Sequence, residues 1–265
     1  MIHRDSSLFR TATVVAALLI TAFIVLVLIG VVTHSPPAVL IESLLSEEIQ
    51  FAIRLSIITS VISTLLCVLV AMPVAYALAR YTFPGKSLVN MMMDIPMALP
   101  PLVAGVGLLL FFGVSPIGKS LAAAGLAFVF TPLGIIVAQF FVNLPYMLRV
   151  ARSTFQSVNP RYEHVAKTLG CTDAQAFWRV TLPMSANGLL AGTVITWSKG
   201  IGEFGAALML AGATRMKTET LPLSLFLNMS TGKLEYAISA ATILIVISII
   251  SLYVFERYSG ATHVY

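Results

Sequence analysis

Long apolar stretches separated by short polar segments dominate the chain. A helix needs roughly 20 predominantly apolar residues to cross a bilayer, and stretches of about that length recur along the whole sequence. They cover residues 12–32, 55–79, 95–118, part of 120–148, 184–212 and 236–255. The pattern therefore predicts an all-α integral membrane protein with about six transmembrane helices, forming a single domain over residues 1–265 whose first helix is about 12–32.

Composition supports a lipid environment. Hydrophobic residues make up 58% of the chain, charged residues only 10%, and the mean hydropathy is +0.95, whereas a soluble domain carries about 25% charged residues. The first stretch exceeds the apolar core of a signal peptide, and no small-residue cleavage site follows it, so we expect a retained helix. Cys67 falls inside a span and Cys171 in a loop, which makes a disulfide between them improbable.

The distribution of Lys and Arg predicts the orientation, because these residues accumulate in cytoplasmic loops. With the N-terminus inside, ten of them fall on the cytoplasmic side: Arg4, Arg10, Arg80, Lys86, Arg149, Arg152, Arg161, Lys167, Arg179 and Arg257. Four fall outside: Lys119, Arg215, Lys217 and Lys233. We therefore expect a multi-pass protein of the cell membrane with both termini in the cytoplasm, whose net charge of +5 reflects topology and not nucleic-acid binding.

Two glycine motifs fit nucleotide-binding patterns by sequence alone. Residues 113–120 fit G-x-x-x-x-G-K-[ST], and residues 200–205 fit G-x-G-x-x-G. A real site of either kind follows a β-strand and opens a helix, whereas both motifs here lie in or beside apolar spans. We interpret them as turns or packing positions, and we identify no catalytic residue and no metal ligand.

The segment at about 149–182 has the pattern of two helices joined by a glycine. Tyr162, Val165, Ala166 and Leu169 form an apolar stripe at helical spacing, which the pattern sets opposite the polar Glu163, His164 and Lys167. Gly170 is a helix stop, and residues 172–175 fit a capping box. Such an amphipathic hairpin either packs against its own membrane helices or docks to a partner.

Residues 163–170, E-H-V-A-K-T-L-G, followed by V-T-L-P at 180–183, resemble the EAA loop of binding-protein-dependent ABC transporter permeases. The resemblance covers about 50–256 and implies a type I ABC importer permease (MetI-like) fold. It implies that this loop is a coupling helix seated on an ATPase subunit. The expected partners are two ATPase copies, an extracytoplasmic binding protein, a second copy of this chain and membrane lipid. ATP and Mg would be bound by the ATPase, with no cofactor on this chain, which would not be an enzyme.

The loop departs from the family pattern in one respect. His164 and Val165 stand where the family has its glutamate and first alanine, and Glu163 lies one residue early. One residue is about 100° of rotation on a helix, so Glu163 is not expected to make the family's glutamate contact. The docking role is carried over to the apolar stripe, His164 and Gly170, and Glu163 is kept among the coupling residues without a specific ion pair to the ATPase.

The predicted fifth span contains ionisable residues, Lys199 and Glu203, among the glycines Gly200, Gly202 and Gly205. Charged groups in a membrane span cost about 2.5–3.5 kcal/mol each and normally face a bundle interior or an aqueous route. Lys199 and Glu203 either neutralise one another as an i, i+4 pair or line a pathway. Asp94 is a further pathway candidate, unless it lies at the membrane interface.

The stretch K-G-I-G-E-F-G-A at 199–206 is similar to the corresponding stretch of permeases for tetrahedral oxyanions. The resemblance implies import of molybdate or tungstate, with sulfate as the alternative. A permease independent of any ATPase, with Asp94, Lys199 and Glu203 as an ion relay, and a membrane scaffold without transport are the competing classes. Flux and ATPase co-purification would separate them.

Overall fold

A computed structural model describes residues 3–259, and within that range the chain is helical with no strand. Residues 1–2 and 260–265 of the predicted domain lie outside it, as do the side chains of residues 3–7, Arg4 included, and those of 255, 256, 258 and 259. The helices in chain order are α1 (His3–His34), α2 (Pro37–Leu45), α3 (Glu47–Arg80), α4 (Lys86–Ala98), α5 (Pro101–Gly113), α6 (Pro116–Ala123), α7 (Pro132–Ser157), α8 (Arg161–Thr168), α9 (Asp173–Ala176), the π-helical turn η1 (Phe177–Thr181), α10 (Leu182–Ile201), α11 (Gly205–Ala211), α12 (Leu221–Ser230) and α13 (Leu234–Ser259).

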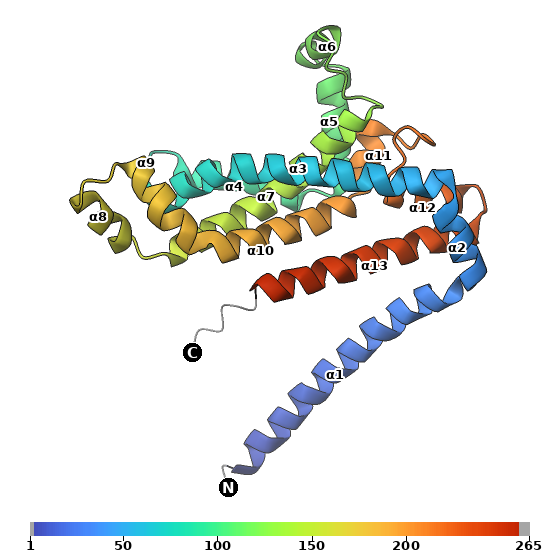
Figure 1. The fold of residues 1–265 in the computed structure, drawn as a ribbon, viewed down its shortest axis with the longest axis horizontal. Helices are drawn as coiled ribbons and strands as arrows, with labels where there is room; N and C mark the ends of the chain where they lie inside the picture. Colours follow the sequence, from blue (N-terminus) through green and yellow to red (C-terminus); the bar gives the residue numbers. More distant parts are fainter. Residues whose placement is uncertain (1–2, 260–265) are drawn as a thin grey trace.

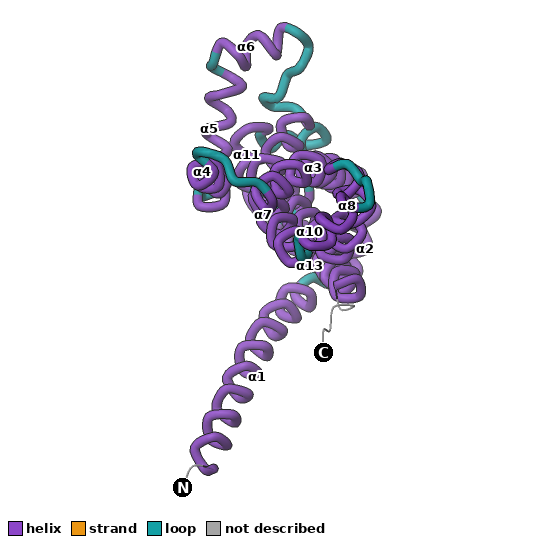
Figure 2. The backbone as a smooth tube through the Cα atoms, turned by 90° about the vertical axis from the view of Figure 1, so that its left-hand side faces the viewer, coloured by secondary structure: helices purple, strands orange, loops and turns teal. Residues whose placement is uncertain are grey.

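The centre of the molecule is a bundle in which α3, α7 and α10 pack along one another, with α13 beside α10 (Figures 1 and 2). Small residues allow the close approach of α10 to α7. A Cβ atom added to Gly188 would lie 2.6 Å from Thr154, and one added to Gly192 would lie 2.6 Å from Val150. Gly188 and Gly192, four residues apart, therefore serve helix packing, and the order of their contacts shows that α10 runs antiparallel to α7.

Helix α1 leaves the bundle. It contacts α13, while its apolar span is exposed (Figures 1 and 2). Where α1 ends, Ser35 Oγ lies 3.2 Å from Ser239 Oγ of α13. The beginning of α1 and the end of α13 both point toward the side of the molecule that carries α8 and α9, which we name the hairpin end; α2 and α12 lie at the opposite end (Figure 1).

Four described helices are long and apolar enough to span a membrane: α1, α3, α7 and α13. The predicted third span at 95–118 is wrong as a single helix, because α4 and α5 meet at a bend of 109° and count as a span only as a broken pair. Leu99 and Pro100 are extended, with ψ of 140° and 134°. The residue before a proline avoids helical geometry, and two consecutive prolines therefore break the helix.

Two further boundaries differ from the prediction. Helix α7 starts only at Pro132 and runs unbroken to Ser157, so Arg149 and Arg152 lie within it and not in the loop assigned to about 149–182. Its apolar positions continue past them as the buried Ala151 and Phe155, which pack in the bundle core. The predicted span at 184–212 is likewise interrupted, since α10 ends at Ile201 and α11 begins at Gly205.

Both glycine motifs lie at helix ends, which was predicted for residues 113–120 but not for residues 200–205, where a continuous span was expected. Gly113 is the last residue of α5, and Ser115 caps α6 by accepting a hydrogen bond from the Gly118 N–H at 3.1 Å. Residues 200–205 form the break between α10 and α11. No strand in the part of the chain that the structure describes precedes either motif, so the backbone context of a phosphate or dinucleotide site is missing there.

Candidate functional site

The hairpin predicted after α7 is present. Helix α8 ends before Gly170, whose φ of 92° is the left-handed conformation that glycine adopts without steric cost. The capping box is confirmed: the Thr172 side chain accepts from the Gln175 N–H, and Gln175 Oε1 accepts from the Thr172 N–H at 2.9 Å. Helix α9 then passes through η1 directly into α10, so a continuous helical segment joins the hairpin to the bundle.

Glu163 lies on the buried face of α8, contrary to the polar face assigned to it. Its side chain accepts three hydrogen bonds, from Arg80 Nε at 2.7 Å, from Tyr76 Oη at 3.0 Å and from Thr181 Oγ1 at 2.6 Å. Arg80 also donates to the Val158 carbonyl at 2.9 Å. The sequence pattern missed this arrangement because Arg80, at the end of α3, is distant in sequence. We name Arg80, Glu163, Tyr76 and Thr181 the Glu163 cluster.

The electrostatics of the Glu163 cluster favour the charged carboxylate. Burial raises the pKa of Glu163, but the hydrogen bonds from Thr181, Arg80 and Tyr76 and the positive charge of Arg80 outweigh it, so the pKa lies below its ordinary value of 4.5. The ion pair has side-chain exposures of only 8% for Arg80 and 4% for Glu163. The Glu163 cluster ties α8 and η1 to the end of α3, and so holds the hairpin on the bundle.

The apolar stripe divides between the two faces of α8. Ala166 is buried beside Glu163, as i and i+3 positions share a helix face. Tyr162, Val165 and Leu169 are instead 53%, 57% and 80% exposed, and His164 and Gly170 are exposed as well. Packing against the protein's own helices thus accounts for only one of the four stripe residues. The other three form an uncovered apolar surface on the hairpin, which we name the hairpin face.

Around the break between α10 and α11, the structure does not form the ion pair of Lys199 and Glu203 that was one of the two alternatives. The helix ends between them, and Glu203 Oε1 instead accepts from the Ala206 N–H at 2.9 Å, where it caps α11. The Lys199 ammonium lies 4.1 Å from the centre of the Tyr146 ring. Among the ionisable residues described, no ion pair joins any two of Asp94, Lys199 and Glu203.

The glycines of this break have different surroundings. Gly200 faces Asn143, with its carbonyl accepting from Gln139 Nε2 at 2.9 Å. A Cβ atom on Gly205 would lie 2.9 Å from Pro101, so glycine allows α11 to contact the start of α5. Gly202 is exposed and has no such constraint. Packing therefore accounts for Gly205, whereas Gly202 stays a pathway prediction.

Asp94 has a partner that the sequence did not suggest. Arg149 Nε and Nη2 donate to the two carboxylate oxygens of Asp94, each at 3.1 Å, and join α7 to α4. One turn further along α7, Arg152 Nη1 donates to Asn90 Oδ1 at 2.8 Å. The sequence reasoning missed both arginines because it placed them in the loop after the span.

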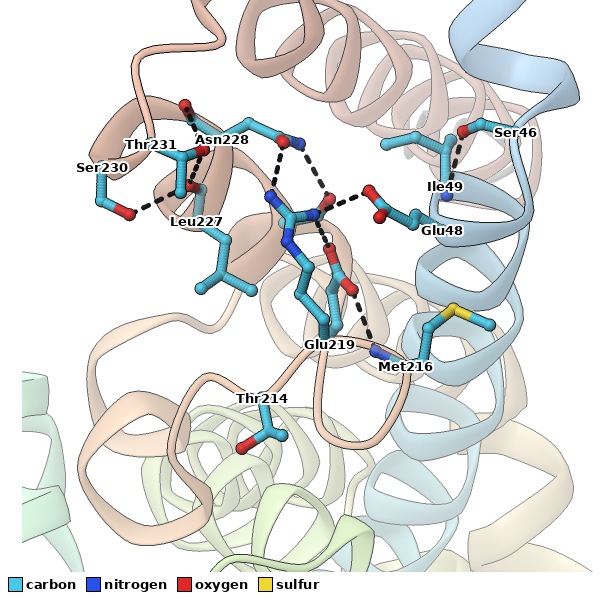
Figure 3. Close-up of polar contacts among 12 residues, drawn as sticks. Ser46, Glu48, Ile49, Thr214, Met216, Glu219, Leu227, Asn228, Ser230 and Thr231 are labelled. Atoms are coloured by element: carbon cyan, nitrogen blue, oxygen red, sulfur yellow. Dashed lines mark hydrogen bonds and ion pairs between the residues drawn. The ribbon is translucent and has the colours of Figure 1, made fainter.

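At the opposite end of the bundle, the loop between α11 and α12 is fixed by a second polar cluster, which Figure 3 shows around Glu48, Glu219 and Asn228. Arg215 Nη1 donates to Glu48 at 2.8 Å and to Glu219 at 3.3 Å, and its Nη2 donates to Asn228 Oδ1 at 2.9 Å. Glu219 is fully buried and also accepts from the Met216 N–H at 3.1 Å. Ion pairs and hydrogen bonds of Arg215 therefore hold the loop in place. In the sequence, the only sign of this cluster is that the loop contains several ionisable residues.

Long apolar helices, a broken helix pair and a helical hairpin at one end define a multi-pass membrane protein with the type I ABC importer permease fold. A solved bacterial ABC transporter involved in the import of the acidic polysaccharide alginate aligns with a TM-score of 0.75 over 98% of this chain and 99% of its own, at 17% identity. The MetNI methionine ABC transporter aligns with a TM-score of 0.61 over 82% and 99%, at 16% identity. These similarities establish the predicted fold.

The chain belongs to the family of binding-protein-dependent transport system inner membrane components, whose pattern matches residues 68–259. It is 36% identical over 180 residues to the sulfate transport system permease protein CysT of Salmonella typhimurium, covering 68% of this chain but only 65% of that relative. It is 37% identical over 200 residues, 75% of each chain, to the molybdenum transport system permease protein ModB of Mycobacterium tuberculosis. The family confirms a transport component, as the loop resemblance predicted.

Proposed function

We propose that this chain is the transmembrane permease subunit of an ATP-driven importer, and that the hairpin face is its contact with the ATPase. The observation that carries the proposal is the combination of a buried ionic anchor with an exposed apolar surface on one short helix. Glu163 fixes α8 to the bundle, while Tyr162, Val165 and Leu169 point away from it. An apolar surface held rigidly and left uncovered suits docking to another protein.

The proposed assembly has two copies of this chain, two ATPase subunits at the hairpin end and an extracytoplasmic binding protein at the other end. ATP and Mg would be held by the ATPase subunits alone. The positive-inside distribution supports a cytoplasmic hairpin end, and both termini would then be cytoplasmic, since α1 begins and α13 ends on that side (Figure 1). The structure of a bacterial alginate ABC transporter with the same fold contains a bound periplasmic protein, which supports the proposed extracytoplasmic binding protein.

We propose a tetrahedral oxyanion as substrate, with molybdate or tungstate first and sulfate as the alternative. Of the two relatives described above, one is named for molybdenum transport and is 37% identical to this chain, and the other is named for sulfate transport and is 36% identical. These anions share a tetrahedral shape and a double negative charge, so one pathway chemistry suits all of them. In this proposal the external binding protein selects the anion, and the permease supplies the route.

The test is uptake of molybdate, tungstate and sulfate into liposomes that contain this chain with its candidate ATPase, with the candidate binding protein supplied outside. ATP-dependent uptake of molybdate or tungstate supports the proposal. Uptake of sulfate alone would retain the permease and overturn the first-ranked substrate. Uptake driven by an ion gradient without the ATPase would instead identify a secondary transporter.

A further inference from the structure

Four charged residues lie on three helices, of which α7 contacts the other two: Asp94 on α4, Arg149 and Arg152 on α7, and Lys199 on α10. The side chains of Arg149 on α7 and Asp94 on α4 are 57% and 39% exposed although they are paired. Each of these residues lies eight positions from the hairpin end of its helix, about 12 Å along the axis. Both side chains are thus exposed at the surface of the chain although they are paired with each other.

Lys199 belongs to the same region. Gly188, Gly192 and Gly200 of α10 face Thr154, Val150 and Asn143 of α7 in turn, which places Lys199 near the level of Tyr146. Its ammonium lies over the Tyr146 ring, and Tyr146 precedes Arg149 by one helical turn, about 5 Å along the axis. Along the axis of α7, Arg149 and the ring that Lys199 covers are therefore about one turn apart. Lys199 also lies beside Ser251 and Leu252 of α13.

The charges of this surface do not balance. Arg149, Arg152 and Lys199 supply three positive charges, whereas Asp94 is the one carboxylate among the described residues that forms an ion pair with any of them. Lys199 is exposed and forms no ion pair among the described residues, and Glu203 is committed to the Ala206 N–H. The region thus offers an electropositive surface in the half of the bundle nearer the hairpin end.

Resting on the proposed function, we infer that Arg149 and Lys199 form a transient binding station for the tetrahedral dianion, with Asp94 as the internal counter-ion that the substrate displaces. A guanidinium donates two parallel N–H bonds to a carboxylate, and it can present the same two donors to an oxyanion. Competition from Asp94 keeps anion binding weak. Weak binding matters because a pathway site must release its substrate as readily as it accepts it.

The experiment uses the complete transporter in liposomes and measures uptake of radiolabelled molybdate and sulfate together with ATP hydrolysis stimulated by the loaded binding protein. Lys199→Met and the double variant Asp94→Asn/Arg149→Gln each remove a positive charge from the station. The double variant leaves no unpaired charge and preserves the hydrogen-bonding groups between α4 and α7. Lys119→Gln, an exposed loss of charge on α6, is the matched control.

We expect each station variant to lower uptake about tenfold or more, as loss of a charged hydrogen bond implies, with stimulated ATP hydrolysis retained and Lys119→Gln equal to wild type. Uptake by the double variant at the wild-type rate would make the Asp94–Arg149 pair purely structural and overturn the inference. Loss of stimulated hydrolysis along with uptake would also overturn it, because the defect would then lie in coupling. A wild-type transporter that moves no oxyanion would refute the proposed function itself, which is a separate outcome.

Discussion

Removal of the Glu163 carboxylate is the sharpest test of the anchor that holds the hairpin. In Glu163→Ala, Arg80 keeps its bond to the Val158 carbonyl but stays buried without a counter-ion, and the hydroxyls of Tyr76 and Thr181 lose their acceptor. Removing one partner of a buried pair costs about 3–5 kcal/mol. For a chain of this size that is a decrease in melting temperature of about 6–20 °C.

Thermal unfolding of the purified complex in detergent measures this effect, and a double-mutant cycle isolates the pair. Glu163→Ala, Arg80→Ala and the double variant should show a coupling energy of about 0.5–3 kcal/mol between the two side chains. Asp173→Asn is the control, because its ion pair with Lys167 is exposed on the same hairpin and should leave the melting temperature unchanged. Additive effects at Glu163 and Arg80 would refute the reasoning that they act as one unit.

The same anchor predicts a pH dependence. The pKa of Glu163 is lower in the folded protein than its ordinary value of 4.5, so its contribution to stability is complete above that pH and decreases as pH falls through the lower, folded pKa. The difference in melting temperature between wild type and Glu163→Gln should therefore narrow below pH 4.5. A difference that stays constant from neutral pH into that acid range would contradict an ionised Glu163.

Three further substitutions test the interpretation of the hairpin face, the helix packing and the opposite end of the bundle. Leu169→Asp places a charge on an 80% exposed position of the hairpin face, and it should abolish co-purification with the ATPase without lowering the melting temperature of the isolated permease. Gly188→Val places a side chain within 2.6 Å of the facing threonine of α7 and should destabilise the permease by about 1–3 kcal/mol in thermal unfolding. Arg215→Met leaves Glu219 buried without its cation and should cost about 3–5 kcal/mol, whereas the exposed Lys217→Met should be neutral in the same assay.

The sequence was informative wherever local chemistry determines structure. Apolar length identified the four helices that are long enough to span a membrane, and the capping box and Gly170 identified the hairpin. Contacts between residues distant in sequence were not predictable in this way, since nothing local to Glu163 or Asp94 indicates Arg80 or Arg149. Pairing of Lys199 and Glu203 at i, i+4, one of the two alternatives considered, assumed a continuous helix, whereas α10 ends between them.

The buried position of Glu163 also bears on the coupling role proposed for this loop, which departs from the family pattern. A shift of one residue rotates a side chain by about 100° around the helix. On α8 that rotation separates the buried Glu163 from the exposed His164. An acidic side chain on the inner face cannot also make a surface ion pair with a partner. In this protein the carboxylate fixes α8 to α3, so contact with the ATPase would depend on the apolar hairpin face, and a force applied there would reach the bundle through Arg80 and through the continuous helix from η1 into α10.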